Sequence, residues 1–340
     1  MNNNEINKEK SKEDIFIVKT TNECLKEALK KPKRKNLFLN VWKEADMCIL
    51  FGDNNTGKSI YAVQIASEIA DNGKKVAYFD FELSDTQFAE RYSLENEETG
   101  LRTHHNFSEN FFRIWINSEY TDYKQFKQKT FERIERLITE DKFEVLIFDN
   151  ITALMLEDST NVDAVGELLA FLSGLKGTYK TSVMLLAHTP KRNPFNPITK
   201  NDLAGTKMLS NLADAILAIG VSTQGTDIRY VVQIKSRHEK DYQTDNVIVY
   251  EVAKETDFLQ FKHLNYSNEK EHLLERPEND KQKRNKKIIA MKIENCNLSL
   301  DSIMQEINKE FPNEIISRQG VKHVLDKADI YDKMINKPIL

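Results

Sequence analysis

The sequence predicts an α/β fold: a mostly parallel sheet flanked by helices, antiparallel strands on its C-terminal side, and a small all-helical module behind it. Two observations support this prediction. Across residues 37–264, short apolar runs alternate with amphipathic stretches, as in consecutive βαβ units. The last runs of this region, 227–238, 246–252 and 258–264, are separated only by turn residues, which indicates an antiparallel meander.

The individual elements follow from the spacing of apolar residues. Apolar runs predict strands at 47–51, 76–81, 111–116, 145–148, 182–187, 215–221 and 230–234, the last of them within the antiparallel meander. Amphipathic spacing predicts helices within 59–70, 123–139, 165–175 and 203–212. A short helix is expected at 22–31 with Thr21 as its N-cap. Residues 1–14 are rich in Asn, Lys and Glu, so we expect them to be disordered.

Four segments are predicted along the chain. Residues 1–36 form a flexible N-terminal segment with one short helix, 37–266 the α/β domain, 267–286 a polar linker, and 287–340 a helical module. This module has two open interpretations. It is a helix-turn-helix that reads bases with Arg318, Gln319 and Lys322, or it is a small packing or partner-binding module.

Composition excludes several classes of protein. The 340 residues are 40% hydrophobic and lack a run of about 18 apolar residues, so no membrane span or membrane partner is expected. The three cysteines are isolated and the start lacks an apolar signal core, so we expect a cytoplasmic protein without a zinc site. The net charge of −4 divides into +4 for residues 1–40, −12 for 41–280 and +4 for 281–340. A uniformly basic coat for nucleic acid is therefore excluded.

One motif carries most of the chemical information. Residues 52–59, GDNNTGKS, match the phosphate-binding pattern G-x-x-x-x-G-K-[ST], with a predicted strand before them and a predicted helix after them. Backbone N–H groups and the helix N-terminus make such a loop a cradle for phosphate. We expect Lys58 to reach the β- and γ-phosphates and the Ser59 hydroxyl to bind Mg²⁺. The predicted nucleotide-binding residues are Gly52, Asp53, Asn54, Asn55, Thr56, Gly57, Lys58 and Ser59.

Carboxylates near strand ends complete the predicted site. Asp149 ends the strand at 145–148 and is the expected second Mg²⁺ ligand, because a carboxylate at the end of a buried strand needs a cation or a donor. Residue 150 is Asn, so the general base must come from elsewhere. Glu82 is the predicted base and Asp80, two residues earlier, the alternative. A capping role for Glu82 before Ser84 also remains open.

These motifs together resemble the RecA-fold P-loop ATPases. The resemblance covers residues 37–264 and rests on the phosphate loop, FELS, LIFDN, LLAHT, DLAGTKMLSNLAD and IKSRH, in that order. Within the fold, the sequence is most similar to hexameric replicative helicases of the DnaB and plasmid RepA types, and to RepA-like AAA-family ATPases of bacterial mobile elements. A DnaB-type N-terminal docking domain does not fit into 36 residues, so the shorter plasmid type is the better match.

The resemblance implies further roles. His188 would sense the γ-phosphate, although this position is often Gln, and Lys235 and Arg237 would reach the ATP of a neighbouring subunit. Alternatively, the two basic residues simply lie on one exposed face of an edge strand and have no role in hydrolysis. The loop at 190–201 would contact single-stranded DNA, or else be a rigid surface loop. Its predicted contact residues are Lys191, Arg192, Phe195 and Lys200.

Two functions remain open at the level of sequence. The resemblance implies hydrolysis of ATP with Mg²⁺, coupled to binding or translocation on DNA by a ring, expected to be a hexamer, in replication of a plasmid or mobile element. Replication or mobilisation proteins would be its partners. The alternative is an ATP-switched DNA-binding, loader or recombination-mediator protein, similar to KaiC or RadA, without unwinding activity.

Overall fold

The computed structural model describes residues 16–121, 125–155, 162–189, 192–203, 207–275 and 280–335. The predictions for residues 1–14 and for Lys191 lie outside these ranges. The chain divides into two compact units, Met1–Leu273 and Leu274–Leu340. Each unit is described by itself.

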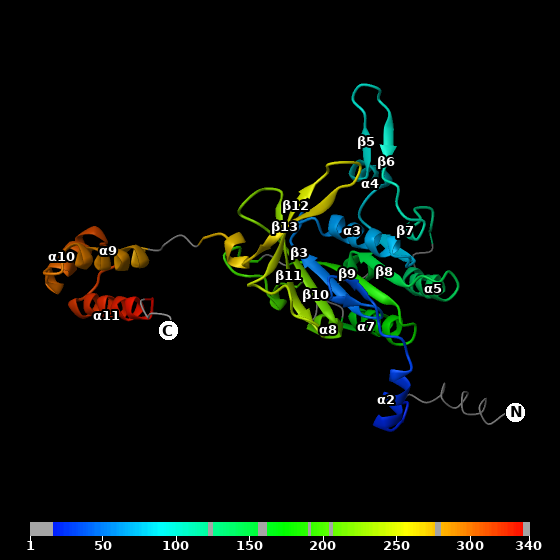
Figure 1. Cartoon of the computed structure of the whole chain (residues 1–340), viewed down its shortest axis with the longest axis horizontal. Helices are drawn as coiled ribbons and strands as arrows, with labels where there is room; N and C mark the ends of the chain where they lie inside the picture. Colours follow the sequence, from blue (N-terminus) through cyan, green and yellow to red (C-terminus); the bar gives the residue numbers. More distant parts are fainter. Residues whose placement is uncertain are drawn as a thin grey trace. The chain divides into compact units, whose positions relative to one another are not determined.

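The first unit is built on a sheet that has nine strands in the described residues (Figure 1). Their order is β13-β12-β11-β10-β3-β9-β8-β4-β7, and the strands from β10 to β7 are parallel, whereas β11, β12 and β13 are antiparallel. The predicted parallel sheet with an antiparallel C-terminal side is therefore confirmed. The bounds are β3 Met47–Gly52, β4 Val76–Asp80, β7 Phe111–Ile114, β8 Val145–Asp149, β9 Ser182–His188, β10 Ala215–Val221, β11 Ile228–Ser236, β12 Val247–Ala253 and β13 Gln260–Ser267.

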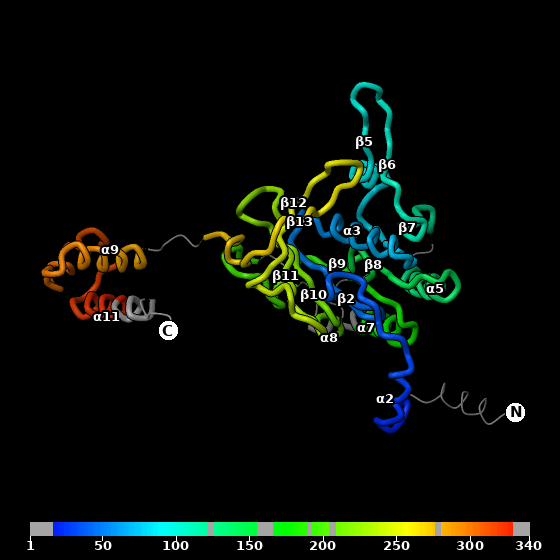
Figure 2. The backbone as a smooth tube through the Cα atoms, viewed as in Figure 1, coloured from blue at the N-terminus to red at the C-terminus, as the bar shows by residue number. Residues whose placement is uncertain are grey.

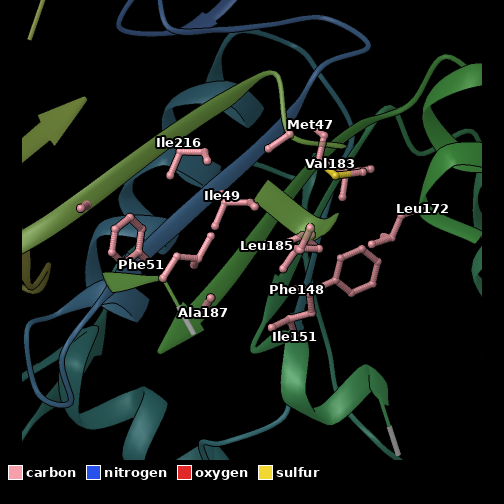
Figure 3. Packing of buried hydrophobic residues seen from close by; sticks show 14 of the residues in the cluster. Met47, Ile49, Phe51, Phe148, Ile151, Leu172, Val183, Leu185, Ala187 and Ile216 are labelled. Carbon is pink, nitrogen blue, oxygen red and sulfur yellow. The ribbon is translucent and has the colours of Figure 1, made fainter. Parts of the chain in front are cut away.

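Helices cover both faces of this sheet. On one face, α3 (Lys58–Asp71) packs its apolar side on alternate residues of β3, β4, β8 and β9. On the other face lie α5 (Phe126–Thr139), α6 (Ile151–Met155), α7 (Val162–Gly177) and α8 (Lys207–Leu212). Figure 3 shows the second face, where Phe148, Leu185 and Leu172 meet in the core. Burial on both faces explains why the central strands read as continuous apolar runs.

Strand register brings the polar strand ends to one edge of the sheet. Gly52 at the end of β3 pairs with His188 at the end of β9, and Asp80 at the end of β4 pairs with Asp149 at the end of β8. Ligands bind outside the carboxyl ends of strands in such sheets. The residues predicted from separate motifs therefore share one edge.

Some local elements differ from the predictions. The first helix, α2, spans Thr21–Leu29 with Thr20, not Thr21, as N-cap, because Thr20 and Glu23 form a capping box. The short strands β1 (Asn36–Phe38) and β2 (Trp42–Lys43), helix α4 (Asp85–Arg91) and the hairpin of β5 (Ser93–Glu95) and β6 (Arg102–His104) were not predicted. Figure 2 shows this hairpin, in cyan, projecting from the first unit.

The second unit consists of three helices, α9 (Asp280–Glu294), α10 (Leu300–Glu310) and α11 (Arg318–Ile335), in the described residues. Its core is small and its own: Ile288, Met291, Ile303, Ile307, Ile316 and Val321. The predicted linker at 267–286 is too long. Its first part forms the short 3₁₀ helix η3 (Glu269–His272), whose two terminal residues are buried, and α9 already begins at Asp280. Polar composition misled the prediction because these polar residues are packed against the sheet.

Among the described residues, every helix is too short or too polar to cross a bilayer.

Candidate nucleotide-binding site

The phosphate loop lies between β3 and α3, and both of its glycines are required by its shape. A Cβ atom at Gly52 would lie 2.7 Å from the carbonyl oxygen of Ile219 on the neighbouring strand. Gly57 has φ +92°, and a Cβ atom there would lie 2.9 Å from the ring of Phe261. The loop therefore wraps tightly and presents the N-terminus of a 14-residue helix, which favours bound anions.

Lys58 is folded back onto its own loop. Its Nζ donates hydrogen bonds to the carbonyl oxygens of Gly52 at 3.0 Å and Asp53 at 2.9 Å. Burial lowers the pKa of this ammonium group, whereas the carboxylates of Asp149, Glu82 and Asp53 act to raise it. A positive charge is thus held at the loop by backbone carbonyls that a phosphate group can replace.

Asp149 and Ser59, the two predicted Mg²⁺ ligands, are brought together. Asp149 is 2% exposed at the end of β8, and it accepts a hydrogen bond of 2.6 Å from the hydroxyl of Tyr78. Burial raises its pKa to about 6, while hydrogen bonds from Ser59 and Tyr78 act in the opposite direction. A hydroxyl and a carboxylate are hard oxygen donors, which suit Mg²⁺.

The described residues contain no cluster of three or more His, Cys, Asp or Glu side chains arranged to hold a metal ion.

Glu82, Asn150 and His188 converge beside the loop. The Asn150 Nδ2 group donates to Glu82 Oε1 and lies 3.2 Å from His188 Nε2, and His188 Nε2 lies 3.6 Å from Glu82 Oε1. They meet because β9, β8 and β4, the strands that precede or carry them, are consecutive neighbours in the sheet. From sequence, Asn150 indicated only that the residue after Asp149 cannot be the general base. Its role as a hydrogen-bond donor to Glu82 depends on strand order, which no local motif reveals.

Asp80, the alternative base, is engaged in local structure. Its Oδ1 accepts hydrogen bonds from the amides of Glu82 and Leu83, and its Oδ2 pairs with Arg113 Nε at 2.9 Å. Its side chain is fully buried. Asp80 therefore fixes the turn that carries Glu82, and it is not free to accept a proton from water.

Lys235 and Arg237, predicted to reach the ATP of a neighbouring subunit, lie in different environments. The Lys235 ammonium donates to the carbonyl oxygens of Ser210 and Ala213, at the C-terminal end of α8, at 2.8 and 2.6 Å. It therefore caps that helix. Arg237 pairs with the buried Asp214 at 3.1 Å, but its own side chain is 56% exposed.

The residues predicted to contact DNA occupy different environments. Arg192 is only 11% exposed and faces the phosphate loop, where its Nε lies 3.8 Å from Asp53 Oδ2. Phe195 is half-buried and Lys200 is exposed, whereas Lys191 lies outside the described residues. In the second unit, Arg318, Gln319 and Lys322 are exposed in the first turns of α11.

The fold and the loop together define a P-loop ATPase of the RecA fold. Strand β8, which ends at Asp149, is separated from the phosphate-loop strand β3 by one further strand, β9. More particularly, the chain belongs to the AAA domain family, whose profile matches residues 18–194, more than half of its length.

Many solved structures are similar to this chain, and two of them serve as examples. The flagellar accessory protein FlaH from Methanocaldococcus jannaschii is 19% identical, and the match covers 65% of this chain and 90% of that chain, with a TM-score of 0.45. A KaiC-like protein from Pyrococcus horikoshii OT3 is 14% identical, and the match covers 66% and 91%, with a TM-score of 0.43. No curated protein matches the chain.

Proposed function

We propose that the protein is an Mg²⁺-dependent ATPase that assembles into a ring, expected to be a hexamer, and couples hydrolysis to movement on single-stranded DNA. A RepA-like helicase or replication ATPase of a plasmid or mobile element is the function that fits best. The observation that carries the proposal is the edge of the sheet where Lys58, Asp149 and Glu82 surround the phosphate loop. The likeness to RepA-type helicases in the order of motifs supports the coupling to DNA.

In this proposal, different residues bind the phosphates, bind Mg²⁺ and activate the attacking water. The loop amides and Lys58 would hold the phosphates, and Ser59 with Asp149 would hold Mg²⁺, which neutralises charge on the transferred phosphoryl group. Glu82 would take the proton of the attacking water, and the Asn150 amide would orient its carboxylate. His188 contacts the same amide and directly precedes the loop proposed to meet DNA, so it would link the two.

Ring assembly is supported by the place of Arg237. Ser236 pairs with Ala215, and Ala215 pairs with Cys48, near the start of β3, whereas the phosphate loop begins at its end. At about 3.3 Å per residue, Arg237 lies about 16 Å along the strands from the level of its own loop. It therefore cannot serve its own nucleotide, so a role in hydrolysis would require the nucleotide of a neighbouring subunit.

The proposal is tested by measuring ATP hydrolysis with and without single-stranded DNA, and strand displacement on a forked duplex with ATP and Mg²⁺. We expect DNA to stimulate hydrolysis and the forked duplex to be separated, with both activities lost in Lys58→Ala. Hydrolysis that DNA does not stimulate, together with no separation of the forked duplex, would refute the motor function but not the ATPase activity.

A second function, an ATP-switched DNA-binding, loader or recombination-mediator protein without unwinding, is favoured by the second unit. This unit has its own core and presents Arg318, Gln319 and Lys322 to solvent at the start of one helix. A variant truncated after Leu273 decides between the two. Loss of sequence-selective DNA binding with hydrolysis retained would support the loader, whereas unchanged selectivity would argue against it.

A further inference from the structure

The loop that follows β9 brings an arginine to the phosphate loop rather than to the surface. The Arg192 side chain is 11% exposed, and its Nε lies 3.8 Å from the carboxylate of Asp53, the second residue of the phosphate loop. Its Nη1 donates a hydrogen bond of 3.3 Å to the carbonyl oxygen of Asn196. A guanidinium has five N–H donors, so this bond leaves others for further partners.

Two buried polar side chains lie beside this guanidinium. Tyr230 and Glu269 are both fully buried, and they interact with each other and with Arg192. One carboxylate oxygen of Glu269 accepts a hydrogen bond of 2.7 Å from the amide of Ile198, in the same loop as Arg192. Burial raises the pKa of both groups, and the nearby charge of Arg192 acts in the opposite direction.

Strand register explains why this pair reaches the phosphate loop. Ile219 on β10 pairs with Gly52, the first residue of the loop, and the next residue, Gly220, pairs with Tyr230 on β11. Gly220 leaves room for the ring, since a Cβ atom there would lie 2.1 Å from Tyr230 Cζ. Tyr230 therefore lies at the level of the loop, two strands away.

We propose that Arg192 is a phosphate-binding residue of the nucleotide site in its own subunit, and that Glu269 and Tyr230 position it. A guanidinium carries a permanent charge and can bind phosphate oxygens through two parallel N–H groups. The separation of 3.8 Å from Asp53 exceeds a hydrogen bond, and the Asp53 side chain is 49% exposed, so a phosphate can displace this carboxylate at small cost. The inference rests on the proposed binding of ATP by the loop.

This role differs from the DNA contact predicted for Arg192 from sequence. A side chain that tracks the backbone of a single strand needs an open, exposed position. Arg192 instead lies between the phosphate loop and two buried polar side chains, whereas Lys200, further along the same segment, is exposed. If Arg192 binds phosphate, its removal weakens ATP binding; if it contacts DNA, its removal weakens DNA binding.

The test is equilibrium binding of ATP with Mg²⁺, and separately of single-stranded DNA, to the full chain and to Arg192→Ala. Arg102→Ala serves as the matched control, because Arg102 is 78% exposed on the projecting hairpin and pairs with Glu95. We expect Arg192→Ala to weaken ATP binding about 10- to 100-fold, the value of hydrogen bonds to a charged group, with DNA affinity and the control unchanged. Unchanged ATP affinity, or a loss confined to DNA, would overturn the inference.

The wild-type measurement separates the two levels of the proposal. If the wild-type chain binds no ATP, the proposed function itself fails, and this inference fails with it. If the wild-type chain binds ATP and Arg192→Ala binds it equally well, only the role of Arg192 is refuted.

Glu269→Gln tests the positioning role by a double-mutant cycle. The amide keeps the size of the side chain and its acceptor for Ile198 but removes the negative charge. We expect it to weaken ATP binding severalfold in the wild type and to have no further effect in Arg192→Ala. Equal effects in both backgrounds would show that Glu269 is merely structural. Thermal unfolding of each variant identifies any that fails to fold.

Discussion

Burial of the Asp149 carboxylate lowers the stability of the folded chain when the group is ionised. Burial among apolar strands raises its pKa from its ordinary value near 4 to about 6, so its ionised form is held against a desolvation penalty. The penalty is present in full above about pH 6, and it is relieved as pH falls through 6 and the folded chain takes up the proton. A bound cation would stabilise the ionised carboxylate, which the apolar surroundings do not.

Replacing this carboxylate should therefore stabilise the nucleotide-free protein. At pH 7.5 we expect Asp149→Asn to raise the free energy of unfolding by about 2 kcal/mol, and the gain should shrink toward pH 5, where the wild-type group is already protonated in the folded chain. The same variant should lose Mg²⁺-dependent hydrolysis. Chemical denaturation at the two pH values measures the effect, and a gain that is larger at pH 5 would contradict this account.

Substitution of Glu82 should affect hydrolysis, whereas substitution of Asp80, at the end of β4, should affect stability. Glu82→Gln removes the proposed base from a half-exposed position, so kcat should fall about 100-fold or more while stability stays unchanged. Asp80→Asn breaks a buried pair with Arg113, so the free energy of unfolding should fall by about 3 kcal/mol. Hydrolysis rates and denaturation curves of both variants check this. A stable, inactive Asp80→Asn beside an active Glu82→Gln would reverse the assignment.

At the scale of elements, the packing of β10 on β11 depends on the absence of one side chain. Gly220→Ala would place a methyl group 2.1 Å from Tyr230 Cζ, and the buried ring has no room to move away. We expect a loss of about 3 kcal/mol or more in unfolding free energy. Gly174→Ala is the matched control, because this glycine lies inside α7 with nothing within 4 Å of the added methyl group. It should stabilise the chain by about 1 kcal/mol. Thermal unfolding distinguishes the two, and shifts of the same sign would contradict the packing described.

Prediction from sequence succeeded where a local pattern carries the information. The strands around the phosphate loop were found because they are buried on both faces and read as apolar runs, and the loop itself because its glycines and lysine are fixed in spacing. Helix ends were found less well. Thr20 and not Thr21 caps α2, since two adjacent threonines offer the same side chain and only the partner Glu23 decides.

Contacts between distant segments could not be predicted. Arg113 binds Asp80 from the neighbouring strand β7, and Asn150 meets Glu82 and His188 only because of the strand order. Arg192 was predicted to contact DNA because the resemblance to RecA-like folds places this loop against single strands and the loop carries several basic residues. Its actual partners, Asp53, Tyr230 and Glu269, lie 139, 38 and 77 residues away along the chain.

At the scale of the whole molecule, a shared site predicts complementation between two inactive variants. Arg237→Ala should lose hydrolysis because its neighbour's nucleotide lacks the guanidinium, and Lys58→Ala because its own loop lacks the ammonium. A mixture of the two contains interfaces with one intact loop facing one intact arginine, so part of the activity should return. Hydrolysis measured against the mixing ratio tests this. No recovery from folded subunits, with Arg237→Ala fully active alone, would exclude a shared site.

The central claim is that the loop of residues 52–59 binds a nucleoside triphosphate. Titration calorimetry of the full chain with ATP and Mg²⁺ tests it most directly. We expect saturable binding to the wild type and an affinity at least about tenfold weaker in Lys58→Ala, which loses a charged hydrogen-bond donor. A wild-type chain without measurable affinity for ATP, or a Lys58→Ala variant that binds it equally well, would contradict the account.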